Sequence, residues 1–148
     1  MMDTQYSREY HDAIGAVLTL HRYLRQSAKA RSATGVSGRQ HATLRALTGG
    51  RRTIGELASL LFVGESATSE LVAKLEQAGY VERVRSAADN RVVHVSITEA
   101  GTEAAESIPL SGLPLLRERL QSLPSEELSS ISQTFRSILS LLEVDYET

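Results

Sequence analysis

Residues 56–101 read ELASLLFVGESATSELVAKLEQAGYVERVRSAADNRVVHVSITEAG, and the spacing of the apolar side chains changes within them. Up to Gly79, apolar residues recur at steps of three and four, which is typical of two short helices joined by a turn. Residues 80–85 and 92–97 instead alternate, as strands do, and a polar tip at 86–90 joins them. The order predicts a helix-turn-helix followed by a β-hairpin, or wing.

Capping residues set the expected limits of the neighbouring helices. Ser37 stands before an apolar run that ends at two glycines, 49–50, so it is placed to cap a helix between these points. Thr53 and Glu56 stand three residues apart, which is the pattern of a capping box. Thr98 is placed to cap a further helix directly after the second strand.

Amphipathic helices flank this lobe on both sides. Residues 8–30 carry one apolar stripe, and residues 99–145 are helical with a break expected at 109–114, where two prolines and a glycine fall. We therefore expect one domain, mainly α with a small β-hairpin wing: a winged helix-turn-helix lobe over about 37–98 between two sets of dimerisation helices. The stripes expected to contact a second copy of the chain comprise Tyr10, Ile14, Val17, Leu128, Ile131, Phe135, Ile138 and Leu142.

The composition limits the classes of function. The 148 residues are 41% hydrophobic and 23% charged, the proportions of a folded domain rather than a disordered chain. The absence of cysteine excludes disulfides, thiolate metal sites and thiol-based redox sensing. No apolar run approaches the ~20 residues that span a membrane. The first residues lack the pattern of a secretory signal, so we expect a cytoplasmic protein with no membrane partner.

Charge is distributed unevenly, although the formal net charge is only −2. Residues 36–98 carry eight basic and six acidic side chains, whereas residues 99–148 carry three basic and nine acidic ones. A polyanion is therefore expected to meet the middle of the chain.

A helix-turn-helix with a wing fits duplex DNA by its geometry. The second helix enters a major groove, and the hairpin reaches the neighbouring backbone or minor groove, where arginine is favoured. Asp89 is expected to hold a wing arginine, Arg91 or Arg83, in a fixed rotamer. The predicted DNA-contact set comprises Ser37, Arg39, Ser66, Thr68, Ser69, Glu70, Lys74, Arg83, Arg85, Asp89 and Arg91. The alternative is a winged-helix protein-interaction module or dimeric scaffold that does not bind DNA, with these side chains facing water.

The chain resembles the multiple-antibiotic-resistance regulator (MarR) family. The resemblance rests on ELASLLFVGESATSELVAKLEQAGYVER followed by DNRVVHVSITEAG. It implies a homodimeric transcriptional regulator, a repressor or an activator, whose terminal helices interlock and whose wing arginine, Arg91, enters the minor groove. Glu70 departs from the family, which often has a basic residue there.

Enzyme chemistry is not expected. The four histidines show no HExxH or other metal-ligand spacing, and the chain has no nucleophile–base set, so we expect no metal and no cofactor. MarR-family effectors include small aromatic anions, metals and thiol oxidants. Without cysteine or clustered histidines, a small aromatic anion is the remaining candidate. Its expected site is the crevice between the dimerisation helices and the lobe, near His21, Arg25 and Arg45.

Overall fold

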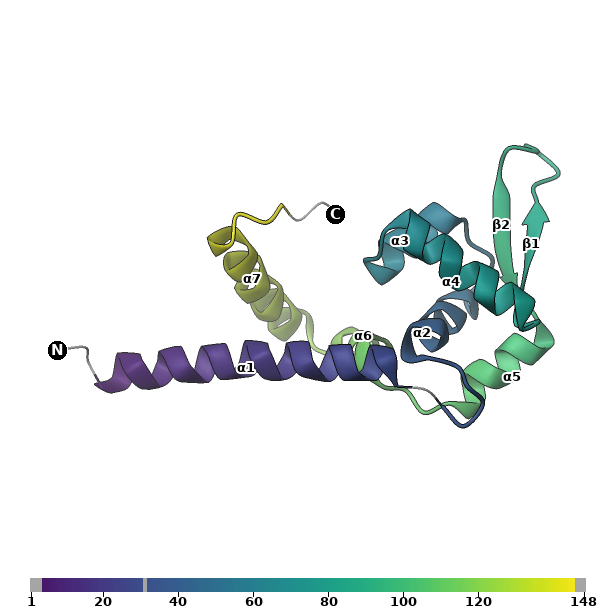
Figure 1. The fold of residues 1–148 in the computed structure, drawn as a ribbon. Coiled ribbons are helices and arrows are strands. Elements are labelled where there is room, and N and C mark those ends of the chain that lie inside the picture. The colour runs from purple at the N-terminus through teal and green to yellow at the C-terminus, as the bar shows by residue number, and fades with distance from the viewer. Residues whose placement is uncertain (1–3, 31, 146–148) are drawn as a thin grey trace. The chain divides into compact units, whose positions relative to one another are not determined.

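The structure is a computed structural model that describes residues 4–30 and 32–145. Its described residues divide into two compact units, which meet between Pro114 and Leu115, within one helix. The first unit holds the winged helix-turn-helix (Figure 1). The elements are α1 (Thr4–Lys29), α2 (Gly38–Leu47), α3 (Ile54–Leu61), α4 (Glu65–Gln77), β1 (Val81–Arg85), β2 (Val93–Ile97), α5 (Glu99–Ser107), α6 (Gly112–Gln121) and α7 (Ser125–Leu141).

The predicted caps are confirmed in the lobe. The Ser37 hydroxyl accepts from the Gln40 backbone N–H at 3.2 Å, and the Gln40 side chain accepts in return from the Ser37 N–H. Thr53 and Glu56 form the same reciprocal pair at the start of α3. The Thr98 hydroxyl accepts from the Gly101 N–H and starts α5. These side chains satisfy backbone donors that the first helical turn leaves unpaired.

The hydrophobic core lies inside the lobe, where α2 contacts α3, α4, α5 and β2. The core extends to α5, beyond residue 98, where the sequence predicts the end of the lobe. Small side chains on α5 allow this close packing. The core comprises Val36, Leu44, Leu47, Leu57, Val72, Leu75, Val81, Val95, Ala104 and Ala105.

The wing is an antiparallel pair whose register runs from Val81 opposite Ile97 to Arg85 opposite Val93. A third segment joins it: Arg52 and Val95 exchange both backbone hydrogen bonds, at 3.0 and 2.7 Å. This bridge is not predicted from the sequence because a single paired residue has no alternating pattern. The bridge ties the middle of β2 to the segment that precedes α3.

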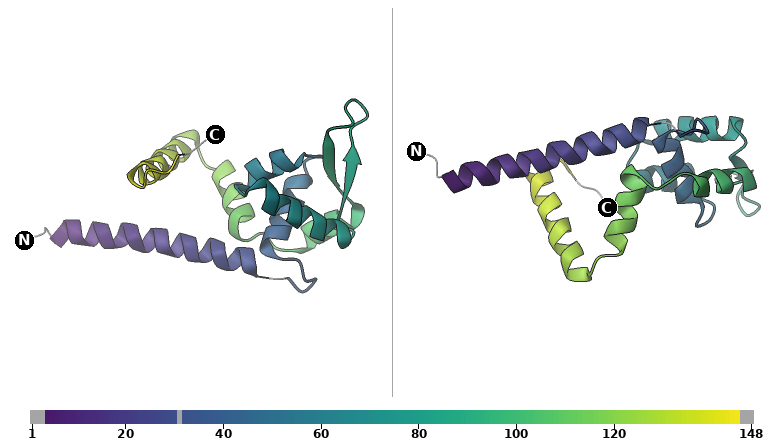
Figure 2. Two further views of the ribbon diagram at one scale, coloured as in Figure 1. Left: turned by 45° about the horizontal axis from the view of Figure 1, so that its top comes forward. Right: turned by 90° about the horizontal axis from the view of Figure 1, so that it is seen from below.

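Helix α1 is one uninterrupted helix (Figure 2) and has no buried side chain. Near its C-terminal end, the Tyr23 hydroxyl accepts from the Gly112 N–H at 2.9 Å. Gly112 has a φ of 59° and lies against Ser27, where any side chain would collide with that residue. The chain therefore returns to α1 at Gly112. The helices are interrupted between Ser107 and Gly112, slightly earlier than the break predicted at 109–114, and Pro114 falls in the first turn of α6.

The second unit, which begins at Leu115, contains the rest of α6 and α7. Glu126 and Glu127 occupy the first turn of α7, where acidic groups favour the helix dipole. Helix α7 also has no buried residue. Leu142 was predicted on its apolar stripe, but the helix ends at Leu141 and Leu142 is its C-cap, 67% exposed.

Candidate nucleic-acid interface

Helix α4 presents a polar stripe to solvent. Ser66, Glu70 and Lys74 stand at steps of four and are exposed, and Gln77 continues the stripe one turn further. The opposite side of α4 is buried through Val72 and Leu75, among others, which fixes the rotation of the helix. The arrangement is that of a recognition helix whose polar side is open to a partner.

The prediction that Thr68 contacts DNA is wrong. Its side chain is fully buried, and its hydroxyl donates to the Gly64 carbonyl at 3.0 Å. A threonine hydroxyl that bonds one turn back along its own helix can be buried without an unsatisfied polar group. Thr68 therefore cannot reach DNA. Ser37 is half-buried and its hydroxyl is engaged in the α2 cap.

Asp89 organises the wing tip in a different way from the one expected. Its Oδ1 accepts from the backbone N–H of Arg91 at 2.9 Å, and its carbonyl accepts from the Val92 N–H at 3.0 Å. Within the described residues, Asp89 makes no ion pair with Arg91 or Arg83. Asp89 therefore shapes the turn that carries Arg91 and leaves the Arg91 guanidinium exposed to solvent.

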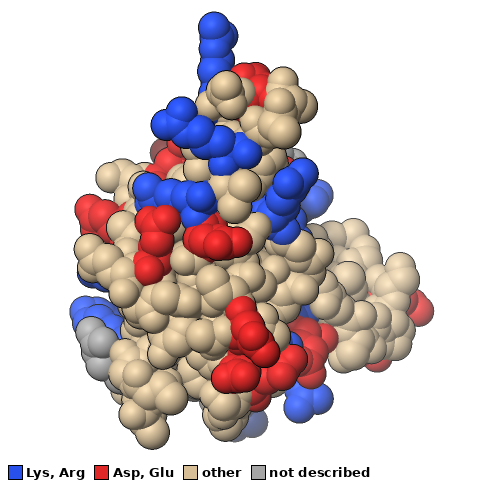
Figure 3. All heavy atoms as spheres, turned by 90° about the vertical axis from the view of Figure 1, so that its right-hand side faces the viewer, with Lys and Arg blue, Asp and Glu red and all other residues tan. Residues whose placement is uncertain are grey.

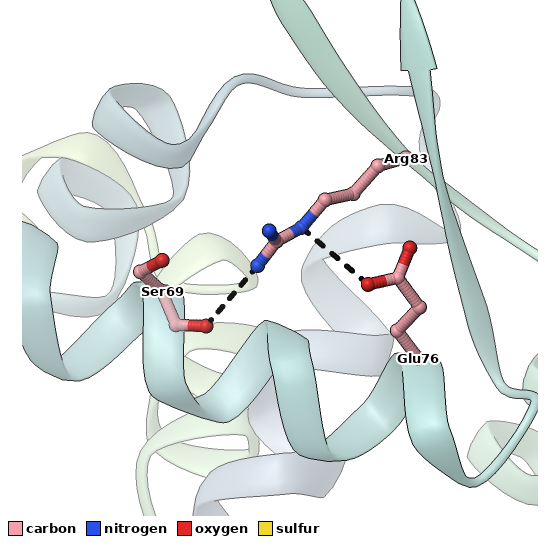
Figure 4. Close-up of polar contacts among 3 residues, drawn as sticks. All are labelled: Ser69, Glu76 and Arg83. Atoms are coloured by element: carbon pink, nitrogen blue, oxygen red, sulfur yellow. Dashed lines mark hydrogen bonds and ion pairs between the residues drawn. The ribbon is translucent and has the colours of Figure 1, made fainter.

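Arg83 projects from β1 onto α4 (Figure 4). Its Nη2 donates to the Ser69 carbonyl at 3.4 Å, and its Nε lies 3.7 Å from Oε2 of Glu76. Two members of the predicted DNA-contact set, Arg83 and Ser69, are thus bonded to each other through a backbone carbonyl.

Basic side chains gather over the wing and at its base, with acidic side chains beside them (Figure 3). Lys74, Arg85 and Arg91 are exposed, and none of them forms an ion pair with another described residue. Unpaired cations on a recognition helix and a wing are available to phosphates.

A cavity of about 180 Å³ lies in the first unit, and the polar stripe of α4 does not contribute to its lining. Its lining is mostly apolar, and Arg39 is the charged side chain among the described residues that line it. The residues that line it are Leu24, Ser27, Ala28, Gly38, Arg39, Ala42, Leu61, Val63, Leu71, Ser111, Gly112, Leu113 and Pro114.

The predicted effector residues do not line this cavity. His21 and Arg25 are exposed on α1, and Arg45 lies half-buried on α2. Arg39, predicted from the sequence as a DNA contact, lines it instead. Sequence spacing could not separate these arginines, because the cavity is formed by segments that are far apart in the chain.

His41 is a buried titratable group to which the sequence pattern assigns no role. Its Nε2 lies 3.0 Å from the Ala105 carbonyl and joins α2 to α5. Burial lowers the pKa of His41 below its ordinary value of 6.5, the backbone hydrogen bond to Ala105 opposes this, and the Arg45 charge lowers the pKa further. The neutral imidazole is therefore the form that the lobe accommodates.

Among residues 4–30 and 32–145, no group of three or more acidic or histidine side chains is placed to hold a metal ion. The described helices also include none that is long and apolar enough to cross a membrane.

Solved structures of transcriptional regulators share this fold. AbsC, a MarR family transcriptional regulator from Streptomyces coelicolor, superimposes with a TM-score of 0.65 at 19% identity, over 97% of both chains. A MarR mutant from E. coli, solved in complex with operator DNA, gives 0.61 at 22% identity, over 93% of this chain and 99% of that one. At such identities the likeness concerns the fold.

Sequence comparison adds similarity over part of the chain. Residues 34–91 match the MarR family model. YwhA of Bacillus subtilis (strain 168), an uncharacterized HTH-type transcriptional regulator, is 31% identical over 93 residues, 63% of this chain and 64% of YwhA. YsmB of the same organism, described in the same words, is 27% identical over 89 residues, 60% of this chain and 61% of YsmB. The chain thus spans less than two thirds of either relative. Residues 34–91, which hold most of the helix-turn-helix and the wing, are thus similar to the MarR family, as the sequence resemblance indicated.

Proposed function

We propose that the protein is a transcriptional regulator, a repressor, that binds double-stranded DNA as a homodimer on a pseudo-palindromic operator in the cytoplasm. The observation that carries this proposal is the polar stripe of α4 with the unpaired cations Lys74, Arg85 and Arg91 on the same winged lobe. Helix α4 would enter the major groove, and Arg91 would enter the neighbouring minor groove. The DNA-complexed MarR and FabT structures, which share this fold, support the assignment.

The homodimer follows from side chains that the single chain leaves exposed. Neither α1 nor α7 buries a residue, although both are amphipathic. Of the predicted contact residues, Tyr10, Ile14, Val17, Leu128 and Phe135 are exposed large apolar side chains, and Ile131 and Ile138 are half-buried. Burying such stripes against a second copy provides the hydrophobic free energy that an isolated chain lacks.

The cavity lined by Arg39 supports an effector. Its apolar lining and the guanidinium of Arg39 suit a small aromatic anion, whose ring would lie against the aliphatic side chains while its carboxylate pairs with that guanidinium. Benzoate is a suitable probe. Calorimetric titration should give saturable binding to the wild type that Arg39→Ala weakens at least tenfold, while Arg25→Ala, on the exposed side of α1, leaves it unchanged.

The test of DNA binding starts from duplexes that the wild type selects from a randomised pool. Lys74→Ala should weaken binding to all duplexes and reduce the slope of log affinity against log salt by about 0.9 for each phosphate that is no longer neutralised. Arg119→Ala, on α6, is the matched control and should change neither quantity. A winged-helix protein-interaction module or dimeric scaffold that does not bind DNA would show no salt-dependent binding to any duplex.

A further inference from the structure

Arg83 reaches two turns of α4 with one side chain. Ser69 and Glu76 are seven residues apart, so they lie on the same side of the helix, about 10 Å apart along its axis. The guanidinium donates to the carbonyl of the first and pairs with the carboxylate of the second (Figure 4). A carbonyl oxygen has two lone pairs, so Ser69 can accept this bond without losing its place in the helix. We call Ser69, Glu76 and Arg83 the helix–wing clasp.

The clasp lies halfway along the wing, beyond which no hydrogen bond or ion pair joins the hairpin to the rest of the lobe among the described residues. On β1, Val81 is buried but the four residues after it are exposed. Arg83 pairs with Val95, and Val95 pairs on its other side with Arg52, so one row across the hairpin is fixed at both edges. From 86 to 91 the tip has only its own turn hydrogen bonds among the described residues. An isolated two-stranded hairpin is marginally stable in water, so its direction depends on such anchors.

The charge of Arg83 is already neutralised, unlike that of the other wing arginines. Glu76 lies beside the guanidinium, whereas Arg85 and Arg91 have no carboxylate partner among the described residues. The Arg83 and Glu76 side chains have exposed fractions of 36% and 42%, and ion pairs in such surroundings add little to folding stability. The geometry of the pair therefore matters more than its contribution to the fold. Two donors in a rigid plane hold an angle that one flexible ammonium would not.

We propose that Arg83 is a positioning residue rather than a DNA contact: the helix–wing clasp fixes the angle between the wing and α4, so that Arg91 and the recognition helix meet one duplex in register. The DNA-binding part of this inference rests on the proposed function. The fixed angle itself is a property of the unbound protein.

The first test compares affinity with its salt dependence on a duplex that the wild type selects from a randomised pool. Arg83→Ala should weaken binding about tenfold and leave the slope of log affinity against log salt unchanged, because the same phosphates remain neutralised. Arg85→Ala is the matched control, two residues along the same strand and unpaired. It should reduce the slope by about 0.9 for each phosphate that Arg85 neutralises. A reduced slope for Arg83→Ala, or an unchanged affinity, would overturn the proposal.

Exchanging the charges of Glu76 and Arg83 distinguishes a positioning role of Arg83 from a direct contact with DNA. Glu76→Arg combined with Arg83→Glu recreates the pair with its partners reversed, so it should recover much of the affinity that Arg83→Glu alone loses. If Arg83 contacted DNA, the double variant would bind no better than the single one.

A distance measurement tests the clasp without DNA. The chain has no cysteine, so spin labels can be attached at Ala88→Cys on the tip and Gln77→Cys at the end of α4. Labelled protein is diluted with an excess of unlabelled protein, so that each distance lies within one chain. The distribution should be narrow in the parent, broader with Arg83→Ala and narrow again in the charge-exchanged variant; equal widths would contradict the clasp. If the wild type bound no duplex, the proposed function would fail, while these widths would still decide whether Arg83 fixes the wing.

Discussion

Asp89 and Thr68 are polar residues of the expected DNA surface, and each bonds to nearby backbone instead. The Thr68 hydroxyl closes a bond to Gly64 inside the lobe, and Asp89 accepts the N–H of Arg91 at the wing tip. A polar side chain of a type that often contacts DNA can thus bond to the protein backbone instead and hold neighbouring residues in place. For Asp89 this difference can be measured, because asparagine keeps the acceptor and removes the charge.

Asp89→Asn should bind the selected duplex at least as tightly as the wild type, since it loses a negative charge and retains the turn. Asp89→Ala also loses that charge but loses the turn bond, worth about 1 kcal/mol, so it should bind more weakly than Asp89→Asn. Anisotropy titrations at one salt concentration provide the comparison. Equal affinities for the two variants would show that the turn bond has no role in presenting Arg91.

The buried side chain of His41 should make the stability of the fold depend on pH. Its pKa in the folded lobe lies below 6.5, so the unfolded chain binds a proton more readily. The contribution of the neutral imidazole to the free energy of unfolding is therefore complete above pH 6.5. It is lost as the pH falls from 6.5 towards the lower pKa of the folded state. Each unit of difference between the two pKa values is worth about 1.4 kcal/mol.

Chemical unfolding at several pH values, at one protein concentration, measures this contribution. The free energy of unfolding of the wild type should fall as the pH drops below 6.5, and that of His41→Gln should fall less. His11→Gln, on exposed α1, should keep the wild-type dependence. A His41→Gln profile parallel to the wild type would refute the assignment.

At the scale of the elements, α5 depends on a close approach to the start of β1. Gly101 lies against the Tyr80 carbonyl, where an added methyl group would overlap the oxygen. Gly101→Ala should therefore destabilise the protein by about 1–3 kcal/mol, because α5 must shift away from the core. Gly15→Ala, in an open position on α1, should instead stabilise it by up to about 1 kcal/mol. Thermal unfolding of both variants distinguishes the two effects; similar shifts would contradict the packing of α5.

The helices and strands could be predicted from the sequence because their signals are local. Contacts between segments far apart in the chain could not be predicted in this way. The caps at Ser37, Thr53 and Thr98 and the alternating strands depend on residues close in sequence, so spacing alone located the recognition helix and the wing. The clasp of Arg83, the bridge at Arg52 and the Arg39 cavity join segments that only the folded chain brings together. The sequence does not distinguish an arginine in the clasp from one in the bridge or in the cavity lining.

At the scale of the whole molecule, the proposed binding to a two-fold operator requires a dimer at micromolar concentration. An obligate pair should bury more than about 2,000 Å² in total. Ile14→Asp places a charge on the apolar stripe of α1 and should shift sedimentation towards the monomer. Thr19→Asp, on the opposite side of the same helix, should leave the dimer intact. A wild-type monomer at these concentrations would contradict the interface.

The most direct test of the central claim is a hydroxyl-radical footprint of the duplex that the wild type selects. A homodimer with two recognition helices and two wings predicts two protected regions related by a dyad, with centres about one helical turn, roughly 10 base pairs, apart or a multiple of it. Arg91→Ala should remove the minor-groove protection at the outer edges and leave the major-groove protection. A single asymmetric region, or no protection at concentrations where the dimer is complete, would contradict the account.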